Sequence, residues 1–163
     1  MRLRGEFRFA NGLIVPNNVT TAGRLEILRM AFTGNTRAVV AAGANFYVGI
    51  CTAIPSDALQ ANQLVEPTIG VNGYARLPVS RDGVGWTTDG VVNNETFIQT
   101  KDLVFAAVGG PFSAAVSRLF LTTSLNAVTG NIIALSAALP NPFTFDVSTP
   151  LVNRTFNYRL YGR

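Results

Sequence analysis

The sequence predicts an all-β protein: an antiparallel β-sandwich of jelly-roll type, in a single domain with one short helix near the N-terminus. Three observations predict this fold. Short segments rich in β-branched and aromatic residues recur along the chain, turn-forming residues separate them, and apolar and polar side chains alternate within the clearest of them. With 163 residues, 48% of them hydrophobic, the chain can bury a real core. Since no repeat or linker divides it, we expect one domain over residues 1–163.

The two ends of the chain carry the clearest strand patterns. In Leu3–Phe9, large apolar side chains alternate with Arg and Glu, and in Arg154–Tyr161 aromatic and Leu side chains alternate with Thr, Asn and Arg. A period of two is typical of a strand with one buried and one solvated face. We therefore expect an N-terminal strand within residues 1–10 and a main β region over residues 45–161. The other strands predicted in that region are Phe46–Cys51, Gly73–Ser80, Thr96–Phe105, Val116–Thr123, Asn131–Leu139 and Phe143–Val147.

One helix and a series of turns separate these strands. Thr20 or Thr21 can cap a helix over residues 20–33, whose apolar side chains share one side and which ends at Gly34. The predicted loops and turns are Asn11-Gly12, Pro16-Asn17-Asn18, Arg81-Asp82-Gly83, Thr88-Asp89-Gly90, Thr129-Gly130-Asn131 and the breaks at Pro140 and Pro142.

The residue types present disfavour an enzyme, a metal site or a bound cofactor. The chain has no His, the usual proton shuttle near neutral pH and the commonest metal ligand. Its one Cys, Cys51, lies in a predicted strand and is expected to be a small core residue. The nine Asp and Glu residues are dispersed singly along the chain. A carboxylate pair could still form in space, so a glycosidase remains a remote alternative.

Charged residues are few, and almost all the basic ones are Arg. Only 13% of residues are charged, so uncharged polar and apolar groups must cover much of the surface, as in a protein that assembles with others. Twelve of the thirteen basic residues are Arg, with Lys101 the exception. Arg is enriched at protein interfaces where Lys is depleted. A genome of high GC content would give the same bias.

The basic residues gather at the two ends of the chain. If the terminal strands pair, they form one positive patch with Phe7, Phe9, Phe156 and Tyr158 behind it. Because no nucleic-acid recognition motif accompanies these residues and the chain holds a single Lys, we favour a protein partner over nucleic acid. The basic candidates for this contact are Arg2, Arg4, Arg8, Arg154, Arg159 and Arg163.

Four apolar residues complete the interface candidates. Val39 and Val40 lie in one Ala/Gly-rich stretch and Phe112 ends another, and such stretches suit either a subunit contact or a buried strand entry or helical turn. Phe7 belongs to the N-terminal strand. Trp86 stands between two predicted turns, where a core anchor, a subunit contact and a carbohydrate-stacking platform are the three possible roles.

Location signals predict synthesis in a cytoplasm. No hydrophobic segment follows the first residues, so no secretory signal is expected. The longest apolar stretch is too short to cross a bilayer, and one Cys allows no disulfide within the chain.

Several short elements, taken in order, resemble small virion proteins of tailed bacteriophages. Gly73-Tyr74-Ala75-Arg76 is followed by an isolated Trp86. The matching segments around them are Phe46-Tyr47-Val48-Gly49, Asn94–Phe105, Gly130–Leu135 and Leu160-Tyr161-Gly162-Arg163. The Arg-rich first strand and the loop from Gly34 to Ala44 have no counterpart in this resemblance.

The resemblance implies a structural component of a phage particle. The leading hypothesis is a capsid decoration or cement protein that stabilises the shell as a homo-oligomer, with a trimer expected, and that binds the major capsid protein or other virion proteins. The alternative is a tail fibre or baseplate protein, with the loops Gly83–Gly90 and Gly109–Phe112 as receptor-binding tips. Either role predicts a location in the virion.

Overall fold

The computed structural model describes residues 3–21, 23–25, 45–52, 63–112, 116–125, 132–140 and 144–162. Every strand pair in it is antiparallel, which confirms the predicted all-β antiparallel class. The strands are β1 (Leu3–Phe9), β2 (Ile14–Val19), β3 (Asn45–Cys51), β4 (Leu77–Ser80), β5 (Trp86–Val92), β6 (Glu95–Thr100), β7 (Leu103–Val104), β8 (Arg118–Thr122), β9 (Ile132–Ser136) and β10 (Thr155–Gly162). A 3-10 turn, η3 (Val71–Gly73), and a four-residue helix, α2 (Leu151–Arg154), accompany them.

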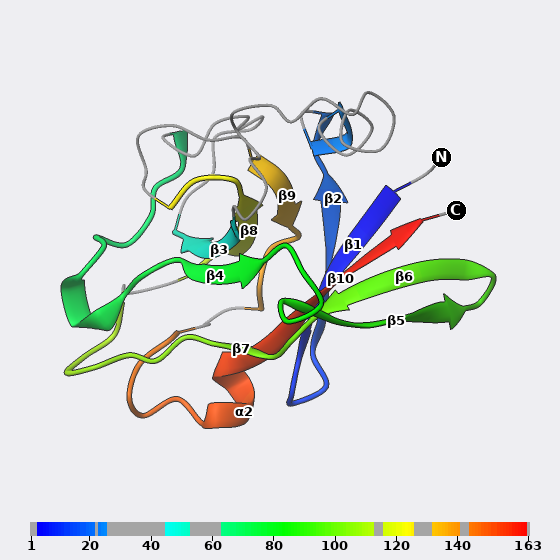
Figure 1. The fold of residues 1–163 in the computed structure, drawn as a ribbon. Helices are drawn as coiled ribbons and strands as arrows, with labels where there is room; N and C mark the ends of the chain where they lie inside the picture. The colour runs from blue at the N-terminus through cyan, green and yellow to red at the C-terminus, as the bar shows by residue number, and fades with distance from the viewer. Residues whose placement is uncertain are drawn as a thin grey trace.

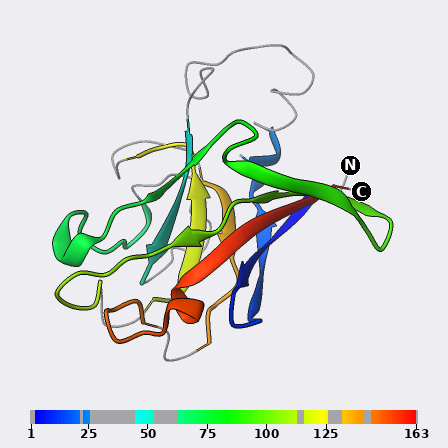
Figure 2. The ribbon, with the colours of Figure 1, turned by 60° about the horizontal axis from the view of Figure 1, so that its bottom comes forward.

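All ten strands belong to one curled sheet. Its order is β4-β3-β8-β9-β2-β1-β10-β6-β5, with β7 paired to β10. Figures 1 and 2 show that the sheet bends into a half-barrel, so that the β3 half faces the β5 half as the two layers of a sandwich do. The rings of Phe46 on β3 and Trp86 on β5 lie 6.4 Å apart, centroid to centroid. Two strands far apart in the sheet order therefore meet across the interior.

The two terminal strands pair in the middle of the sheet. β1 runs antiparallel to β10, from Leu3 opposite Gly162 to Phe9 opposite Phe156. The predicted alternation is confirmed, because Phe7 and Phe9 are buried while Arg4 and Arg8 stand on the opposite face of the strand.

An aromatic cluster fills one end of the half-barrel. The ring of Phe105 lies within 6.1 Å, centroid to centroid, of the rings of Tyr74, Phe112, Phe145 and Phe156. Most of these contacts are edge-to-face or offset stacked, geometries that add about 0.5–1.5 kcal/mol per pair to the burial of apolar area. This end of the interior is therefore the densely packed core.

The Gly-Tyr-Ala-Arg element is a buried structural motif. Arg76, 2% exposed, donates from Nε to Glu66 Oε1 at 2.9 Å and from Nη1 to the Ser124 carbonyl at 2.7 Å. Tyr74 Oη donates to the same Glu66 carboxylate, and burial, together with the charge of that carboxylate, raises the pKa of Tyr74. The guanidinium lies 5.2 Å from the centre of the Phe120 ring. A buried charge needs such full pairing, so this motif fixes the loop around Glu66 to β8 and its following residues.

Two predicted turns are strands. The loop expected at Pro16-Asn17-Asn18 lies in β2, where Asn17 pairs with Gly5 on one side and Ser136 on the other. The turn expected at Thr88-Asp89-Gly90 lies in β5, paired with β6. In both places pairing with neighbouring strands overrides the local turn preference.

Two predicted strands differ in extent. Gly73 has a φ of +80° inside η3, so the strand predicted over Gly73–Ser80 begins only at Leu77. The segment Thr96–Phe105 forms two strands, β6 and β7, because the Lys101 amide between them donates to the Gly85 carbonyl.

The predicted strand Phe143–Val147 is wrong for its described residues. Asp146 Oδ1 accepts hydrogen bonds from the amides of Ser148 and Thr149 at 2.8 Å each, which closes a turn. Phe145 is fully buried, so its apolar character serves the aromatic cluster and not a strand face.

The start of the predicted helix is confirmed at its cap. Thr20 Oγ1 accepts a hydrogen bond from the Gly23 amide at 2.9 Å, and residues 21 and 23–25 are helical. The rest of the helix predicted over 20–33, and the turn predicted at 129–131, lie outside the described residues.

Candidate functional site

The outer face of the terminal strands carries a connected set of arginine, aromatic and acidic side chains. We call it the arginine face. It lies on β1, β10 and β6 and consists of Arg4, Glu6, Arg8, Glu95, Phe97, Gln99, Arg159 and Tyr161. Alternation in three paired strands places these residues on one face, while Phe7, Phe156 and Tyr158 point to the interior.

Arg4 is held on this face by a carboxylate and a ring. Its Nε donates to Glu95 Oε2 at 3.0 Å, and its Nη2 is paired with the same carboxylate. Its guanidinium carbon lies 3.8 Å from the centre of the Tyr161 ring. The hydrogen bond to Glu95 raises the pKa of Arg4. The side chain keeps 44% of its surface exposed, so the guanidinium is ordered and still reachable by a partner.

Arg159, two residue pairs further along the β1–β10 ladder, is ordered in the same way. Its Nε donates to Gln99 Oε1 at 2.8 Å, and its guanidinium carbon lies 4.0 Å from the centre of the Phe97 ring. The Phe97 and Tyr161 rings are themselves 6.0 Å apart. Cation and ring therefore alternate across the face.

Glu6 joins the remaining members of the face. Its Oε1 accepts a hydrogen bond from Tyr161 Oη at 2.7 Å and lies 3.5 Å from Arg8 Nη1. Its Oε2 lies 3.5 Å from Arg4 Nη1. Three guanidinium groups thus share the face with two carboxylates, Glu6 and Glu95. The predicted positive patch carries a net charge of about one, and its distinctive property is fixed geometry.

The other predicted interface residues fall into four groups. Phe7 and Phe112 are buried in the core, so the expectation that they contact a partner is wrong. Arg154 lies in α2, and its Nη1 approaches the Phe105 carbonyl at 3.5 Å rather than joining the arginine face. Trp86 is half-buried where the β3 half and the β5 half of the sheet meet, beside Phe46. We call this contact between the two halves the seam. Arg2, Val39, Val40 and Arg163 lie outside the described residues.

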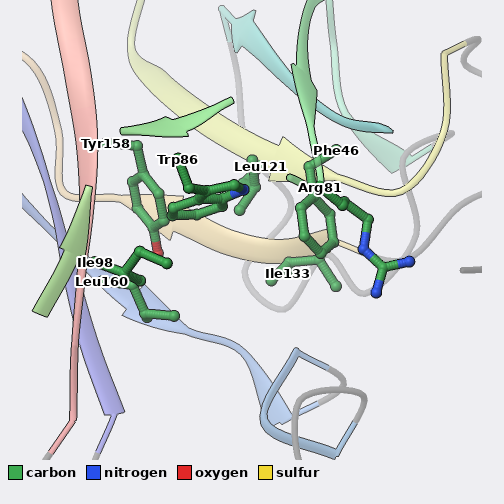
Figure 3. Close-up of a pocket in the computed structure, with 8 residues that line it drawn as sticks. All are labelled: Phe46, Arg81, Trp86, Ile98, Leu121, Ile133, Tyr158 and Leu160. Carbon is green, nitrogen blue, oxygen red and sulfur yellow. The ribbon is translucent and has the colours of Figure 1, made fainter. Parts of the chain in front are cut away.

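A second feature, which the sequence patterns did not indicate, is an apolar pocket at that seam. It has a volume of about 280 Å³ and lies inside the half-barrel, between the two halves of the sheet (Figure 3). Its lining comes from β3, β8 and β9 on one side, β5, β6 and β10 on the other, and the turn after β4: Phe46, Arg81, Trp86, Ile98, Leu121, Ile133, Tyr158 and Leu160. No sequence signal shows which inward-facing positions leave space between them.

Within the described ranges, no three His, Cys, Asp or Glu side chains come together in a group that could hold a metal ion. Nor does any helix there have the length and hydrophobicity needed to cross a membrane. No protein-family model matches the sequence, and no curated protein matches it.

Proposed function

We propose that this chain is a structural protein of a bacteriophage particle, namely a capsid decoration or cement protein that attaches through the arginine face. The carrying observation is the arrangement of Arg4 and Arg159, each stacked on an aromatic ring and oriented by a side-chain acceptor. Arg and aromatic residues dominate the energetics of protein interfaces. Ordered guanidinium groups lose less conformational entropy on binding than free ones, which favours attachment.

The exposed ion pairs of Arg4 and Arg8 on this face contribute little to the stability of the chain itself. Arg4 and Arg8 are about half and one third exposed, and exposed ion pairs contribute about 0–1 kcal/mol. An elaborate set of contacts with so small a stabilising effect is better explained by recognition. The sequence resemblance to small phage virion proteins supplies the class of partner, the major capsid protein or another virion protein, and the symmetric oligomer, a trimer, is part of the same proposal.

The first experiment measures the copy number of the polypeptide in purified particles by quantitative mass spectrometry, relative to a major structural protein. Hundreds of copies are expected for a decoration or cement role. A few copies to a few dozen would support the tail fibre or baseplate alternative. Absence from particles would overturn the virion proposal.

A second experiment tests the face. The double variant Arg4→Glu/Arg8→Glu is expected to reduce occupancy on particles at least ten-fold, because it reverses two of the three cations. Arg24→Glu is the matched control, since Arg24 is exposed in the helical turn after β2 and is not a member of the arginine face. Equal occupancy of the double variant and the control, with both folded by circular dichroism, would show that attachment uses another surface.

The tail alternative has one structural observation in its favour. The β5–β6 hairpin extends beyond the rest of the sheet, and Val91 near its tip is 71% exposed (Figure 2). Val84, in the turn before β5, is 68% exposed. Exposed apolar side chains on projecting segments suit a receptor contact.

A further inference from the structure

The sheet ends in two edge strands that differ in length and composition. β4, at one end of the strand order, has four residues and contains Pro78, which has no amide hydrogen to donate. Short edge strands and Pro are common means of preventing a further strand from pairing with an edge. β5, at the other end, has seven residues and contains neither Pro, Lys nor Arg. It therefore lacks the features that block such pairing.

The free side of β5 is open to an approaching strand. Among the described residues β5 pairs with β6 alone, and five of its seven residues are exposed. Figure 2 shows the β5–β6 hairpin projecting beyond the rest of the sheet, and Figure 1 shows β5 as the outermost strand there. A partner strand thus reaches this side without meeting the other described strands.

The hairpin turn determines which backbone groups point to the free side. Residues 93–94 form a two-residue turn, so Val92 and Glu95 beside it exchange both of their backbone hydrogen bonds. Hydrogen-bonded and non-hydrogen-bonded positions alternate along an antiparallel pair. Val91 and Asp89, one and three residues before Val92, are therefore non-hydrogen-bonded positions. Their amide and carbonyl groups point away from β6, toward the free side.

We propose that β5 of a second copy of this chain pairs with this edge, antiparallel and about a two-fold axis at Gly90. In this register Asp89 of each copy is opposite Val91 of the other, and the two residue pairs exchange four backbone hydrogen bonds. Gly90 is opposite Gly90 of the second copy, at the intervening position where the Cα atoms approach to about 4.5 Å. The edge is therefore complementary to itself, as a two-fold contact requires.

Charge favours this register over the neighbouring antiparallel ones. Asp89 is the single charged residue of β5. An axis at Asp89 would place two carboxylates directly opposite each other, which destabilises a strand pair. An axis at Val91 would place Asp89 opposite Asn93, whose φ of +50° belongs to the turn and not to an extended strand. The axis at Gly90 avoids both conflicts and covers part of the Val91 side chain, which is 71% exposed in the single chain.

The size of the contact predicts its strength. Stable protein interfaces bury about 1,200–2,000 Å² in total, and two paired strands of seven residues cover less than this. We therefore expect pairs of copies that dissociate on dilution.

This contact is independent of the attachment to a particle. The arginine face lies on β1, β10 and β6, so it does not include β5. A two-fold contact also differs from the three-fold contact of a trimer, so the two are compatible, and trimers paired through β5 would form hexamers. Failure of either proposal leaves the other in place, because the variants that test them share no residue.

The test is analytical ultracentrifugation of the whole chain over a series of concentrations. We expect the average mass to double across the series, whether the unit at low concentration is one chain or a trimer. Val91→Lys places a cation opposite Asp89 of the second copy, at both symmetric positions, whereas Val91→Asp places a second carboxylate there. The dissociation constant of Val91→Lys should be at least about five-fold lower than that of Val91→Asp. Repulsion by the net charge of +4 predicts the opposite order.

Val92 provides the matched control, because its side chain lies on the other face of β5, opposite Thr88 of the second copy. Val92→Lys and Val92→Asp make the same changes of charge away from Asp89, so their dissociation constants should differ less than about two-fold. The double variant Asp89→Lys/Val91→Asp exchanges the two charges and should restore the affinity of Val91→Lys to within about three-fold. All variants should keep the circular dichroism spectrum of the parent, since these side chains are exposed.

A backbone variant tests the edge itself. Val91→Pro removes an amide that points to the free side and leaves the hydrogen bonds to β6 in place, so it should weaken the pairing at least about ten-fold. Pairing of Val91→Pro with the affinity of the parent would overturn the assignment to this edge. Equal dissociation constants for Val91→Lys and Val91→Asp would overturn the register at Gly90. A mass that stays constant over the whole concentration series would overturn the proposal.

Discussion

The Phe46 and Trp86 rings meet nearly at right angles, at 86° with 6.4 Å between centroids, although their strands lie at opposite ends of the sheet order. No strand pairing joins β3 to β5, so side-chain packing holds the two halves of the half-barrel together at this point. Trp86 also contacts Tyr158 edge-on, at 6.2 Å, and so links β5 to the middle of the sheet. The shape of the interior depends on these rings.

Removing the Phe46 ring should open the seam. Phe46→Ala is expected to lower the free energy of unfolding by about 2 kcal/mol, less than for a fully buried ring. It should also shift the emission of Trp86, the single Trp of the chain, to longer wavelength because water reaches the indole. Phe97→Ala, on the outer face, is the control and should leave the emission unchanged. The same emission from both variants would show that Phe46 does not shield Trp86.

Breaking the buried Arg76–Glu66 pair should be costly. Arg76→Met leaves the Glu66 carboxylate, only 6% exposed, without its cation, and is expected to reduce the free energy of unfolding by about 3–5 kcal/mol. The double variant Arg76→Met/Glu66→Leu should lose less than this single variant. Urea unfolding measures both. Arg4→Met, which breaks an exposed pair, should cost less than about 1 kcal/mol and serves as the comparison. A double variant as unstable as Arg76→Met would contradict the charge-burial argument.

Gly5 is required because two side chains occupy the space where a Cβ would stand. A Cβ there would lie 2.3 Å from Asn17 Oδ1 and 2.4 Å from Tyr158 Oη, so Gly5→Ala should destabilise the fold by about 1–3 kcal/mol. Tyr158→Phe removes a buried hydroxyl that has no partner of hydrogen-bond geometry among the described residues, so alone it should leave stability equal or slightly higher. In the Tyr158→Phe background, Gly5→Ala should cost less. Thermal unfolding of the four proteins would show this, and strictly additive effects would contradict it.

Cys51 should make stability fall at alkaline pH. Burial raises the pKa of its thiol from 9.0 to about 12, so between these values the unfolded chain loses a proton that the folded chain keeps. The unfolded state then binds fewer protons, and the free energy of unfolding decreases as pH rises from about 9 to 12, by at most about 1.4 kcal/mol per pH unit from this group. Cys51→Ala should show a shallower decline in urea titrations. Parallel curves would refute the assignment to Cys51.

Periodicity predicted the strands that have one clear buried face. The alternation of Phe7 and Phe9 with Arg residues, and of Phe156 and Tyr158 with Asn and Arg, identified β1 and β10 and their shared faces. Because the terminal strands do pair, the expectation that Arg4, Arg8 and Arg159 lie together is also correct.

Local turn signals predicted the position of this hairpin turn wrongly, because pairing with the neighbouring strand decides where the chain reverses. Thr88-Asp89-Gly90 reads as a turn, yet the chain reverses at Asn93 and Asn94, whose positive φ values of 50° and 62° suit a two-residue hairpin. The Asn93-Asn94 pair is therefore the sequence signal for this hairpin turn.

The charge balance of the candidate site depends on partners distant in the sequence. Glu95 neutralises Arg4 across 91 residues, and no local pattern indicates that contact. Likewise, Glu66 lies in a segment without periodicity, so its burial with Arg76 could not be expected from spacing alone. Pair contacts of this kind follow from the fold and not from the pattern of residues along the chain.

The pairing of β1 with β10 also sets how the molecule would respond to a pulling force. Leu3 and Gly162 stand opposite each other at the same end of seven antiparallel residue pairs. Tension applied at these two residues would load one pair at a time, as in opening a zipper, whereas a shearing pull would load all seven together. The chain should therefore yield at low force along this path. A partner that transmits tension through this chain would have to hold it by the faces of its sheet rather than by its ends.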